Sequence, residues 1–452
     1  MTSEERIKEG KKENGHVEPT HYFRGYLNFW VGQILSLLGS NVVNFALIWW
    51  LTVKTGSPFV LGLAVFMGMG PRLFVTLFAG VYVDRWSRKK VITVADTAQA
   101  LLSLFLVVAF LMGYAEVWLI LVVVALGGVA GAFHGPAVQA IIPLMVPQEH
   151  LSRVNGWTYL ANSLIMIIGP PVGALLLLFF DINQILWIDS ITYVFAIIPV
   201  LLIRIPAIKT KKKEGRSFRA DFGEGVTFIR DTPGLLSLLS AFTVTNALLS
   251  PLFMGLLPVL VTNVHKGRAD DLAFIMALLN VGMLGGGVLM STWKGFNRKA
   301  FGVLVSMFMF TGAMLVVPLA KGTNWSVVMG VALLVFGFFL PVGNISSQTI
   351  WQQVVPPEKL GRVFSVRLVL AQGVTPFATL LLGGLAEVVG VLPIFIVNAA
   401  LQLVFLTYLT LFTKFIDLDD RILGRTEGGE VSHMTPLDDQ KSSTEEKKTP
   451  SA

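Results

Sequence analysis

The sequence predicts an all-α integral membrane protein in which twelve transmembrane helices form two six-helix pseudo-repeats. Hydrophobic residues make up 54% of the 452 residues and charged residues only 14%, whereas soluble domains average about 25% charged residues. The mean hydropathy is +0.70. Twelve long apolar segments, and a motif that occurs in both halves of the chain, complete the case for this fold class.

Each apolar segment is close to or longer than the roughly 20 residues that a helix needs to cross a bilayer. The runs are continuous rather than alternating, which excludes a transmembrane β-barrel. We expect spans near 26–50, 59–83, 91–112, 117–140, 157–179, 184–204, 236–261, 271–292, 301–319, 325–348, 365–388 and 391–413.

The apolar segments divide the chain into five regions. Two six-helix bundles are separated by a basic stretch and flanked by hydrophilic tails, which we expect to be flexible. The predicted regions are an N-terminal cytoplasmic tail (1–22), the N-terminal bundle (23–204), a cytoplasmic linker (205–234), the C-terminal bundle (235–414) and a C-terminal cytoplasmic tail (415–452).

The linker carries apolar residues at helical spacing, namely Phe218, Phe222, Val226 and Ile229. This spacing predicts an amphipathic helix that lies along the membrane surface. Such a helix either straps the two bundles together or is a solvated connection, and the sequence leaves both interpretations open.

Lys and Arg gather in the loops on one side of the predicted bundle. By the positive-inside rule these loops face the cytoplasm. Because the number of spans is even, both termini are then expected on the cytoplasmic side of the cell membrane. The basic loops contain Arg85, Arg88, Lys89, Lys90, Arg153, Lys209, Lys211, Lys212, Lys213, Arg216, Arg219, Lys294, Arg298, Lys299, Lys359 and Arg362, and the opposite loops only Lys54, Lys266, Arg268 and Lys321.

The composition excludes several functions. The absence of cysteine rules out disulfides, thiol catalysis and cysteine metal sites, and the six histidines show no metal-ligand spacing. No phosphate-binding Gly-x-x-x-x-Gly-Lys-Ser/Thr loop is present, so ATP is not the direct driver. We predict no catalytic residue, metal or cofactor. The net charge of +7 reflects the basic loops rather than a nucleic-acid partner.

Two related segments show that the halves are repeats. Residues 146–154 read VPQEHLSRV and residues 355–363 read VPPEKLGRV, with six of nine positions identical at an offset of 209 residues. Each segment follows the fourth span of its half. A repeated six-span unit with a central cavity at the seam is the architecture of transporters.

The loop between the second and third spans reads GVYVDRWSRKK over residues 80–90. Gly80 permits close helix approach. Asp84 lies at a helix end, where backbone amides or Arg88 are available partners. Arg85, Arg88 and Lys89 present positive charge to anionic lipid.

This loop resembles the Gly-x-x-x-Asp-Arg-x-x-Arg-Lys signature of the major facilitator superfamily, in which it latches the cytoplasmic side of the outward-facing state. The chain resembles in particular the macrolide-efflux branch of the drug:proton antiporters, through AD at 95–96, AFHGPA at 132–137, ID at 188–189 and LGRVFS at 360–365. The resemblance implies the major facilitator fold, alternating access, export of hydrophobic small molecules in exchange for protons, antibiotic resistance, and action as a monomer in the lipid bilayer.

The fifth span contains GPPVG at 169–173, which resembles the Gly-Pro-x-x-Gly antiporter signature. Pro170 frees a backbone carbonyl and permits a helix bend, while Gly169 and Gly173 allow tight helix contact. One departure concerns span four, where Gly127 replaces the arginine that many proton-driven relatives carry.

Three titratable residues inside the spans are proton-coupling candidates: Asp96, Asp189 and His134. A charge in the middle of a bilayer costs about 2.5–3.5 kcal/mol on insertion scales, so such residues are rare and often functional. Each also has a structural interpretation. Asp96 would pair with the basic cluster around Arg88, Asp189 would bond across helices, and His134 would be a hydrogen-bonded packing residue.

Polar residues on the spans expected to face the cavity are candidates for substrate binding. Arg72 would bind an anionic group or a carboxylate such as Asp96, or would extend toward the cytoplasm. The neutral candidates, which would otherwise bond helix to helix, are Gln33, Asn41, Asn44, Asn162, Asn246, Asn344 and Gln372.

Two rival functions stay open. A carrier for a lipid, siderophore or other metabolite would use the same fold, and Arg72 favours it. A membrane receptor or enzyme without transport activity is a rival of another class, but the spans contain no pair of carboxylates or histidines spaced for catalysis.

Overall fold

The computed structural model describes residues 20–203, 205, 218–293, 295–356, 358–413, 415 and 418–419. It describes the side chains of all of these except residues 20–21, 77–85, 143, 148, 152 and 218–221. In this part of the chain the secondary structure is entirely helical, and 12 helical segments are long and apolar enough to cross a membrane. The predicted fold class is confirmed.

Six helices form the N-terminal bundle, and each is connected to the next by a short turn. The longest has 36 residues and so extends about 54 Å, well beyond a hydrocarbon core of about 30 Å. They are α2 (Thr20–Thr55), α3 (Pro58–Arg85), α4 (Arg88–Leu111), α5 (Val117–Met145), α6 (Gln148–Phe179) and α7 (Ile182–Leu202).

The C-terminal bundle follows the linker helix α8 (Phe218–Asp231). Its first span is interrupted by π-helical turns, whereas its other spans are essentially regular. The elements are α9 (Leu235–Leu248), η1 (Leu252–Leu256), α10 (Leu257–Val259), η2 (Leu260–Val264), α11 (Ala269–Thr292), α12 (Lys299–Val316) with η3 (Val317–Leu319), α13 (Trp325–Val354), α14 (Leu360–Val389) and α15 (Val391–Phe412).

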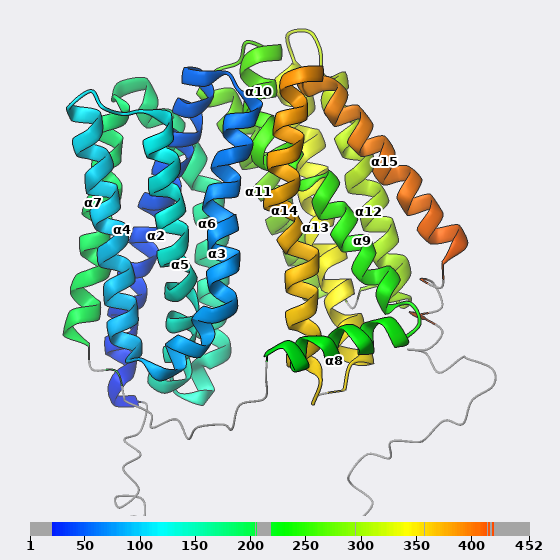
Figure 1. Cartoon of the computed structure of the whole chain (residues 1–452), viewed down its shortest axis with the longest axis horizontal. Helices are drawn as coiled ribbons and strands as arrows, with labels where there is room; N and C mark the ends of the chain where they lie inside the picture. The colour runs from blue at the N-terminus through cyan, green and yellow to red at the C-terminus, as the bar shows by residue number, and fades with distance from the viewer. Residues whose placement is uncertain are drawn as a thin grey trace, which may run out of the picture.

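The 209-residue offset of the sequence repeat also relates the helices. It carries the first residue of α7, position 182, onto the first residue of α15, position 391, and the last residue of α2, position 55, onto the last residue of η2, position 264. Figure 1 shows the two bundles side by side, with α8 lying across the lower end of the C-terminal bundle.

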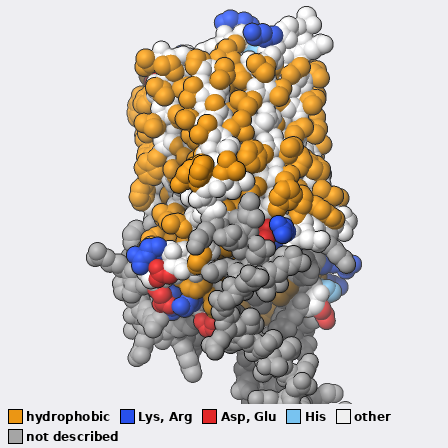
Figure 2. Space-filling view, turned by 90° about the vertical axis from the view of Figure 1, so that its right-hand side faces the viewer, with side chains coloured by type: hydrophobic (Ala, Val, Ile, Leu, Met, Phe, Trp, Pro, Cys, Tyr) orange, Lys and Arg blue, Asp and Glu red, His pale blue; other side chains and the backbone are white. Residues whose placement is uncertain are grey.

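Charge marks the two ends of the molecule. We call the end that carries Arg88, Lys89, Arg153, Lys359 and Arg362 the basic end; it is the lower end in Figure 1. Figure 2 shows a broad hydrophobic belt over the spans, with charged side chains gathered above and below it. This is the surface of a multi-pass membrane protein.

Helix α8 packs on the basic end of the C-terminal bundle, chiefly against α14. Ile229 is buried and Phe222 and Phe228 are partly buried, while Gly225 lies against the Arg362 backbone. The expected apolar face is therefore only partly right, because Val226 is exposed. The side chain of Phe218 lies outside the described residues. The helix is fixed to the C-terminal bundle by packing and is not a fully solvated connection.

The expectation of a flexible C-terminal tail is wrong at its start. Phe415, Leu418 and Asp419 are fully buried. The Asp419 carboxylate accepts hydrogen bonds from the backbone amides of Ala300 (2.8 Å) and Phe301 (3.2 Å), which are among the unpaired amides at the N-terminus of α12. Phe415, Leu418 and Asp419 are thus part of the folded C-terminal bundle.

At the end opposite the basic end, the two bundles meet along α3 and α14. Gly62 is so close to α14 that an added Cβ would lie 2.6 Å from the Thr379 carbonyl oxygen. The Glu387 carboxylate accepts hydrogen bonds from the Ser57 hydroxyl and from the Phe59 amide (3.3 Å). Glu387 therefore caps α3 from the other bundle.

Candidate functional site

A row of polar side chains runs along one face of α4 inside the N-terminal bundle. Asp96, Gln99 and Ser103 are spaced by three and four residues, which puts them on the same face. They extend over about 10 Å of the helix axis. Asp96 is only 2% exposed, so an ionisable group is buried among apolar spans, where burial requires polar partners.

Asp96 has partners from two other helices. Gln33 on α2 donates a hydrogen bond from Nε2 to Asp96 Oδ2 (3.0 Å). His134 on α5 places Nε2 3.0 Å from Asp96 Oδ1, an ion-pair distance without hydrogen-bond geometry. The His134 side chain is 22% exposed. Asp96 is thus enclosed, and His134 connects it to a more open part of the bundle.

The expected pairing of Asp96 with Arg88 is wrong. Arg88 Nη1 instead donates a hydrogen bond to the Ala140 carbonyl oxygen of α5 (3.1 Å). One reason is geometric: Asp96 lies two turns along α4 from Arg88, so partners on α2 and α5 at its own depth are nearer. Because Arg88 bonds the Ala140 carbonyl oxygen, the titratable side chain nearest to Asp96 in its own surroundings is His134.

A second polar group surrounds Asp189 on α7. Ser40 on α2 donates a hydrogen bond to Asp189 Oδ1 (2.6 Å), and its Oγ also lies 3.3 Å from the Tyr193 hydroxyl oxygen. Tyr193 donates to Gln99 Oε1 on α4 (3.2 Å). Asp189 thus bonds across helices, as its structural interpretation expected, but its partners also lead back to α4.

We call the two groups together the polar column. Its upper contact joins Ser190 of α7 to Ser103 of α4, with 3.1 Å between the hydroxyl oxygens. Its two groups meet on α4, where Asp96 and Gln99 are one turn apart. Carboxylates, imidazole and hydroxyls can all take up or release a proton or relay a hydrogen bond. The column therefore consists of groups inside the N-terminal bundle that can exchange a proton or relay a hydrogen bond.

The C-terminal bundle has a neutral counterpart of part of this column. The 209-residue offset carries Asp189 onto Asn398 and Tyr193 onto Gln402, both on α15. Asn398 donates to the Leu248 carbonyl oxygen (3.1 Å) and Gln402 Nε2 to Thr245 Oγ1 (2.6 Å). Titratable groups in one repeat are therefore matched by amides in the other.

Several predicted substrate-binding residues are engaged within the protein. Gln33 bonds Asp96, Asn41 bonds the Leu37 carbonyl oxygen on its own helix (2.8 Å), and Asn246 bonds the Ala371 carbonyl oxygen of α14 (2.7 Å). These bonds are helix-to-helix or intrahelical contacts of the kind common in membrane bundles. The remaining candidates Asn44, Arg72, Asn344 and Gln372 are exposed, and Asn162 is half-buried.

The loop between the second and third spans, residues 80–90, is only partly described. The backbone of residues 80–85 belongs to α3, but the side chains of Gly80, Asp84 and Arg85 lie outside the described residues. Lys89 donates hydrogen bonds from Nζ to the Leu201 and Ile203 carbonyl oxygens (2.7 Å each). Lys89 thus satisfies carbonyl groups at the C-terminal end of α7.

The Gly-Pro-x-x-Gly motif lies where α6 packs on α2. A Cβ on Gly169 would lie 3.1 Å from Asn41 Cβ, and one on Gly173 would lie 2.9 Å from Phe45 Cδ1. The helix continues through Pro170. The glycines therefore set the distance between two helices of the bundle, and the helix bend stays a prediction.

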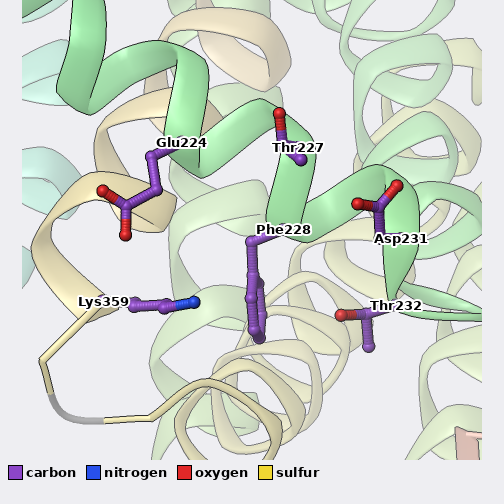
Figure 3. Close-up of a pocket in the computed structure, with 6 residues that line it drawn as sticks. All are labelled: Glu224, Thr227, Phe228, Asp231, Thr232 and Lys359. Atoms are coloured by element: carbon purple, nitrogen blue, oxygen red, sulfur yellow. The ribbon is translucent and has the colours of Figure 1, made fainter.

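A surface pocket of about 540 Å³ lies at the basic end, between α8 and the start of α14. Figure 3 shows Lys359 pointing toward the Phe228 ring, with Nζ 5.3 Å from the ring centroid. Nearby, Arg362 Nη1 lies 2.5 Å from Glu224 Oε2. These contacts hold the linker helix against α14. We therefore interpret the pocket as a gap in the packing of these two helices rather than as a ligand site.

Sequence reasoning missed Arg367 on α14, although a charged residue within a span is a readable signal. Its Nη1 lies 2.5 Å from Gln348 Oε1 on α13. It also missed Ser40, Gln99 and Tyr193, because the sequence does not show which uncharged polar residues of different spans bond to one another. These three residues belong to the polar column only because the folded structure brings their side chains within hydrogen-bond distance of one another.

Two packed six-helix bundles with a seam between them and a polar column inside one define a membrane transporter. The chain belongs to the Major Facilitator Superfamily, because the model of that family matches residues 29–379. Among its relatives is the macrolide efflux protein A of Streptococcus pyogenes, 29% identical over 83% of this chain and 93% of the relative. The multidrug efflux pump Tap of Mycolicibacterium fortuitum is 25% identical over 78% and 87%.

Solved structures support the fold. The nucleoside transporter NupG superposes with a TM-score of 0.65 at 14% identity, covering 85% of this chain and 98% of that one. The relatives and the fold are those of transporters rather than enzymes. In the described part of the chain, no group of three His, Asp or Glu residues could hold a metal ion.

Proposed function

We propose that this protein is a proton-coupled exporter of hydrophobic small molecules of the macrolide and multidrug type. It works as a monomer in the cell membrane, by alternating access, with its basic end and both termini in the cytoplasm. Efflux of such substrates confers antibiotic resistance on the cell. The observation that carries the proposal is the polar column with its two carboxylates, Asp96 and Asp189.

The column supports proton coupling for a physical reason. A carboxyl group surrounded by apolar spans is disfavoured in its charged form unless partners stabilise it. Asp96 Oδ1 lies 3.0 Å from His134 Nε2, and Asp189 accepts a hydrogen bond from Ser40. We infer that these two carboxyl groups take up and release the coupled protons when the bundles rearrange. The efflux relatives support the substrate class.

The test is efflux of a labelled macrolide from cells that express the protein, with and without a protonophore. We expect efflux that the protonophore abolishes. We expect Asp96→Asn and Asp189→Asn to remove its dependence on the pH gradient. Glu116→Gln serves as the control, because Glu116 is an exposed acid without a side-chain cap bond. Efflux that persists unchanged in both aspartate variants would overturn the coupling role.

A second candidate is a carrier for a lipid, siderophore or other metabolite. Arg72 favours it, since this exposed span residue makes no ion pair with any acid in the described part of the chain. If no macrolide moves in the efflux test, uptake or export of anionic amphiphiles, lost in Arg72→Ala, would support this candidate instead.

A further inference from the structure

Arg367 is a positive charge inside a span of the C-terminal bundle. It lies seven residues from the start of α14, about 10 Å along the helix axis. The other charged residues in the described C-terminal spans lie within three residues of a span end, as Arg362 and Glu387 do. A charge at this depth is costly and is kept where it has a partner or a function.

The contacts of Arg367 hold it in place without neutralising it. Its guanidinium lies near two aromatic rings, 5.7 Å from the Trp351 centroid and 5.5 Å from the Phe364 centroid. Its Nη1 bonds Gln348 Oε1. No carboxylate among the described residues lies within ion-pair distance of it. A guanidinium has five N–H donors, and the hydrogen bond to Gln348 uses only one of its nitrogens.

The facing helix α13 supplies further donors beside this guanidinium. Asn344, Gln348 and Trp351 are spaced by four and three residues and so share one face of α13. Trp351 is 1% exposed, and its Nε1 has no hydrogen-bond partner among the residues that the structure describes. Asn344, one turn deeper in the membrane than Gln348, is exposed. The cluster therefore combines one unneutralised cation with an unused indole N–H and an accessible amide.

We propose that Arg367, with Gln348, Trp351 and Asn344, forms a binding site for the carboxylate or phosphate group of an amphipathic ligand. A guanidinium binds such groups with two parallel hydrogen bonds, and the aromatic rings pre-organise it. This inference goes beyond the proposed export function, because it adds ligands with an anionic group to the hydrophobic substrates proposed above. The same chemistry fits the phosphate of a lipid headgroup, and the experiment separates the two sources.

The test is binding of a matched pair of probes, dansylaminoundecanoate and its methyl ester, to purified protein in neutral-lipid nanodiscs. We expect the acid to bind the wild type more tightly than the ester. In Arg367→Gln the acid should lose about tenfold to a hundredfold in affinity, in keeping with hydrogen bonds to a charged group. The affinity of the ester should stay unchanged.

Two further variants make the result decisive. Gln348→Glu keeps the arginine but supplies an internal carboxylate beside it, so we expect the same selective loss of acid binding. Arg230→Gln removes an exposed arginine of α8 that lies outside the proposed site, and it should leave the acid-to-ester ratio as in the wild type. An unchanged ratio in both Arg367→Gln and Gln348→Glu, or a ratio lost equally in Arg230→Gln, would overturn the proposal.

The source of the anion follows from repeating the titration in nanodiscs that contain phosphatidylglycerol. If the site holds a lipid headgroup, this lipid will compete with the acid in the wild type but not in Arg367→Gln. If acid binding is unaffected, the site serves the ligand itself. Binding is measured without a proton gradient, so failure of the macrolide efflux test leaves this inference standing. Failure of the acid-binding test likewise leaves the proposed macrolide export standing.

Discussion

At the scale of single residues, several polar side chains act by completing the hydrogen bonding of a helix that is distant in sequence. Asp419 caps α12, Glu387 caps α3 and Lys89 completes the C-terminal end of α7. Span prediction finds each helix but not these partners, because a cap depends on which chain end or loop arrives there in the folded state. Asp419, placed in a tail expected to be flexible, is the clearest case.

The Asp419 cap predicts a measurable loss of stability. Asp419→Ala removes the acceptors of two backbone amides and should destabilise the C-terminal bundle by about 1 kcal/mol. Asp419→Asn keeps one acceptor oxygen and should lose less. Thermal unfolding of the purified protein in detergent measures both. Equal midpoints for the wild type and Asp419→Ala would show that the cap contributes nothing.

His265 predicts a pH dependence of stability. It follows the end of η2 and stacks on Trp325 with 4.5 Å between ring centroids. Burial lowers the pKa of His265 below its ordinary 6.5, so the unfolded chain binds more protons in this range. The stability contribution is therefore present above about pH 6.5 and is lost as the pH falls toward the folded-state pKa.

His265→Phe keeps the ring contact and removes the titration. We expect the unfolding midpoint of the wild type to fall more steeply than that of His265→Phe between pH 7.5 and pH 5, roughly the interval over which histidine titrates. Parallel curves for the two proteins would contradict the assignment. All other titratable groups are shared, so they cancel in the comparison.

At the scale of elements, the spans follow from run length and hydropathy, and their number is confirmed. The seventh span is the main exception. We expected one regular helix, but η1 begins directly after Pro251 and η2 follows Pro258 and Val259. Proline removes a backbone donor and crowds the preceding turn, which a wider π turn relieves. Hydropathy carries no information on this, although π turns often lie at functional sites.

The contact between α3 and α14 predicts the effect of one added methyl group. Gly62→Ala would put Cβ 2.6 Å from the Thr379 carbonyl oxygen, so the two helices must move apart. We expect a loss of about 1–3 kcal/mol of stability, as for overpacked cores, and reduced efflux. Gly127→Ala is the matched control, because no atom lies within 4 Å of its added Cβ. Equal behaviour of the two variants would refute this account of the seam.

At the scale of the whole molecule, the bundles are joined at the end opposite the basic end by polar as well as apolar contacts. Asn263 donates a hydrogen bond to the Gly56 carbonyl oxygen (2.9 Å), beside the contact of Ser57 with Glu387. For alternating access these contacts must break in each cycle. Sequence reasoning located the halves and their repeat, but not which side chains join them, since partners such as Ser57 and Glu387 are 330 residues apart.

Because the chain contains no cysteine, the contact between Ser57 and Glu387 can be tested by introducing a pair of cysteines. In Ser57→Cys/Glu387→Cys, oxidation should link α3 to α14 and stop efflux, and reduction should restore it. The two single variants under the same oxidant are the controls. Full efflux by protein whose cross-link is verified by mass spectrometry would mean that this end does not open during transport.

The two repeats carry different residues at one equivalent position of a helix contact. Asn398 occupies in α15 the position that Asp189 occupies in α7, and each helix packs on the equivalent neighbour, α9 or α2. The second repeat thus has an amide side chain at this position, in a helix that packs on its equivalent neighbour. Asp189→Asn copies into the first half a residue that the second half carries, so we expect this variant to fold, and its transport activity then tests the proposed proton exchange.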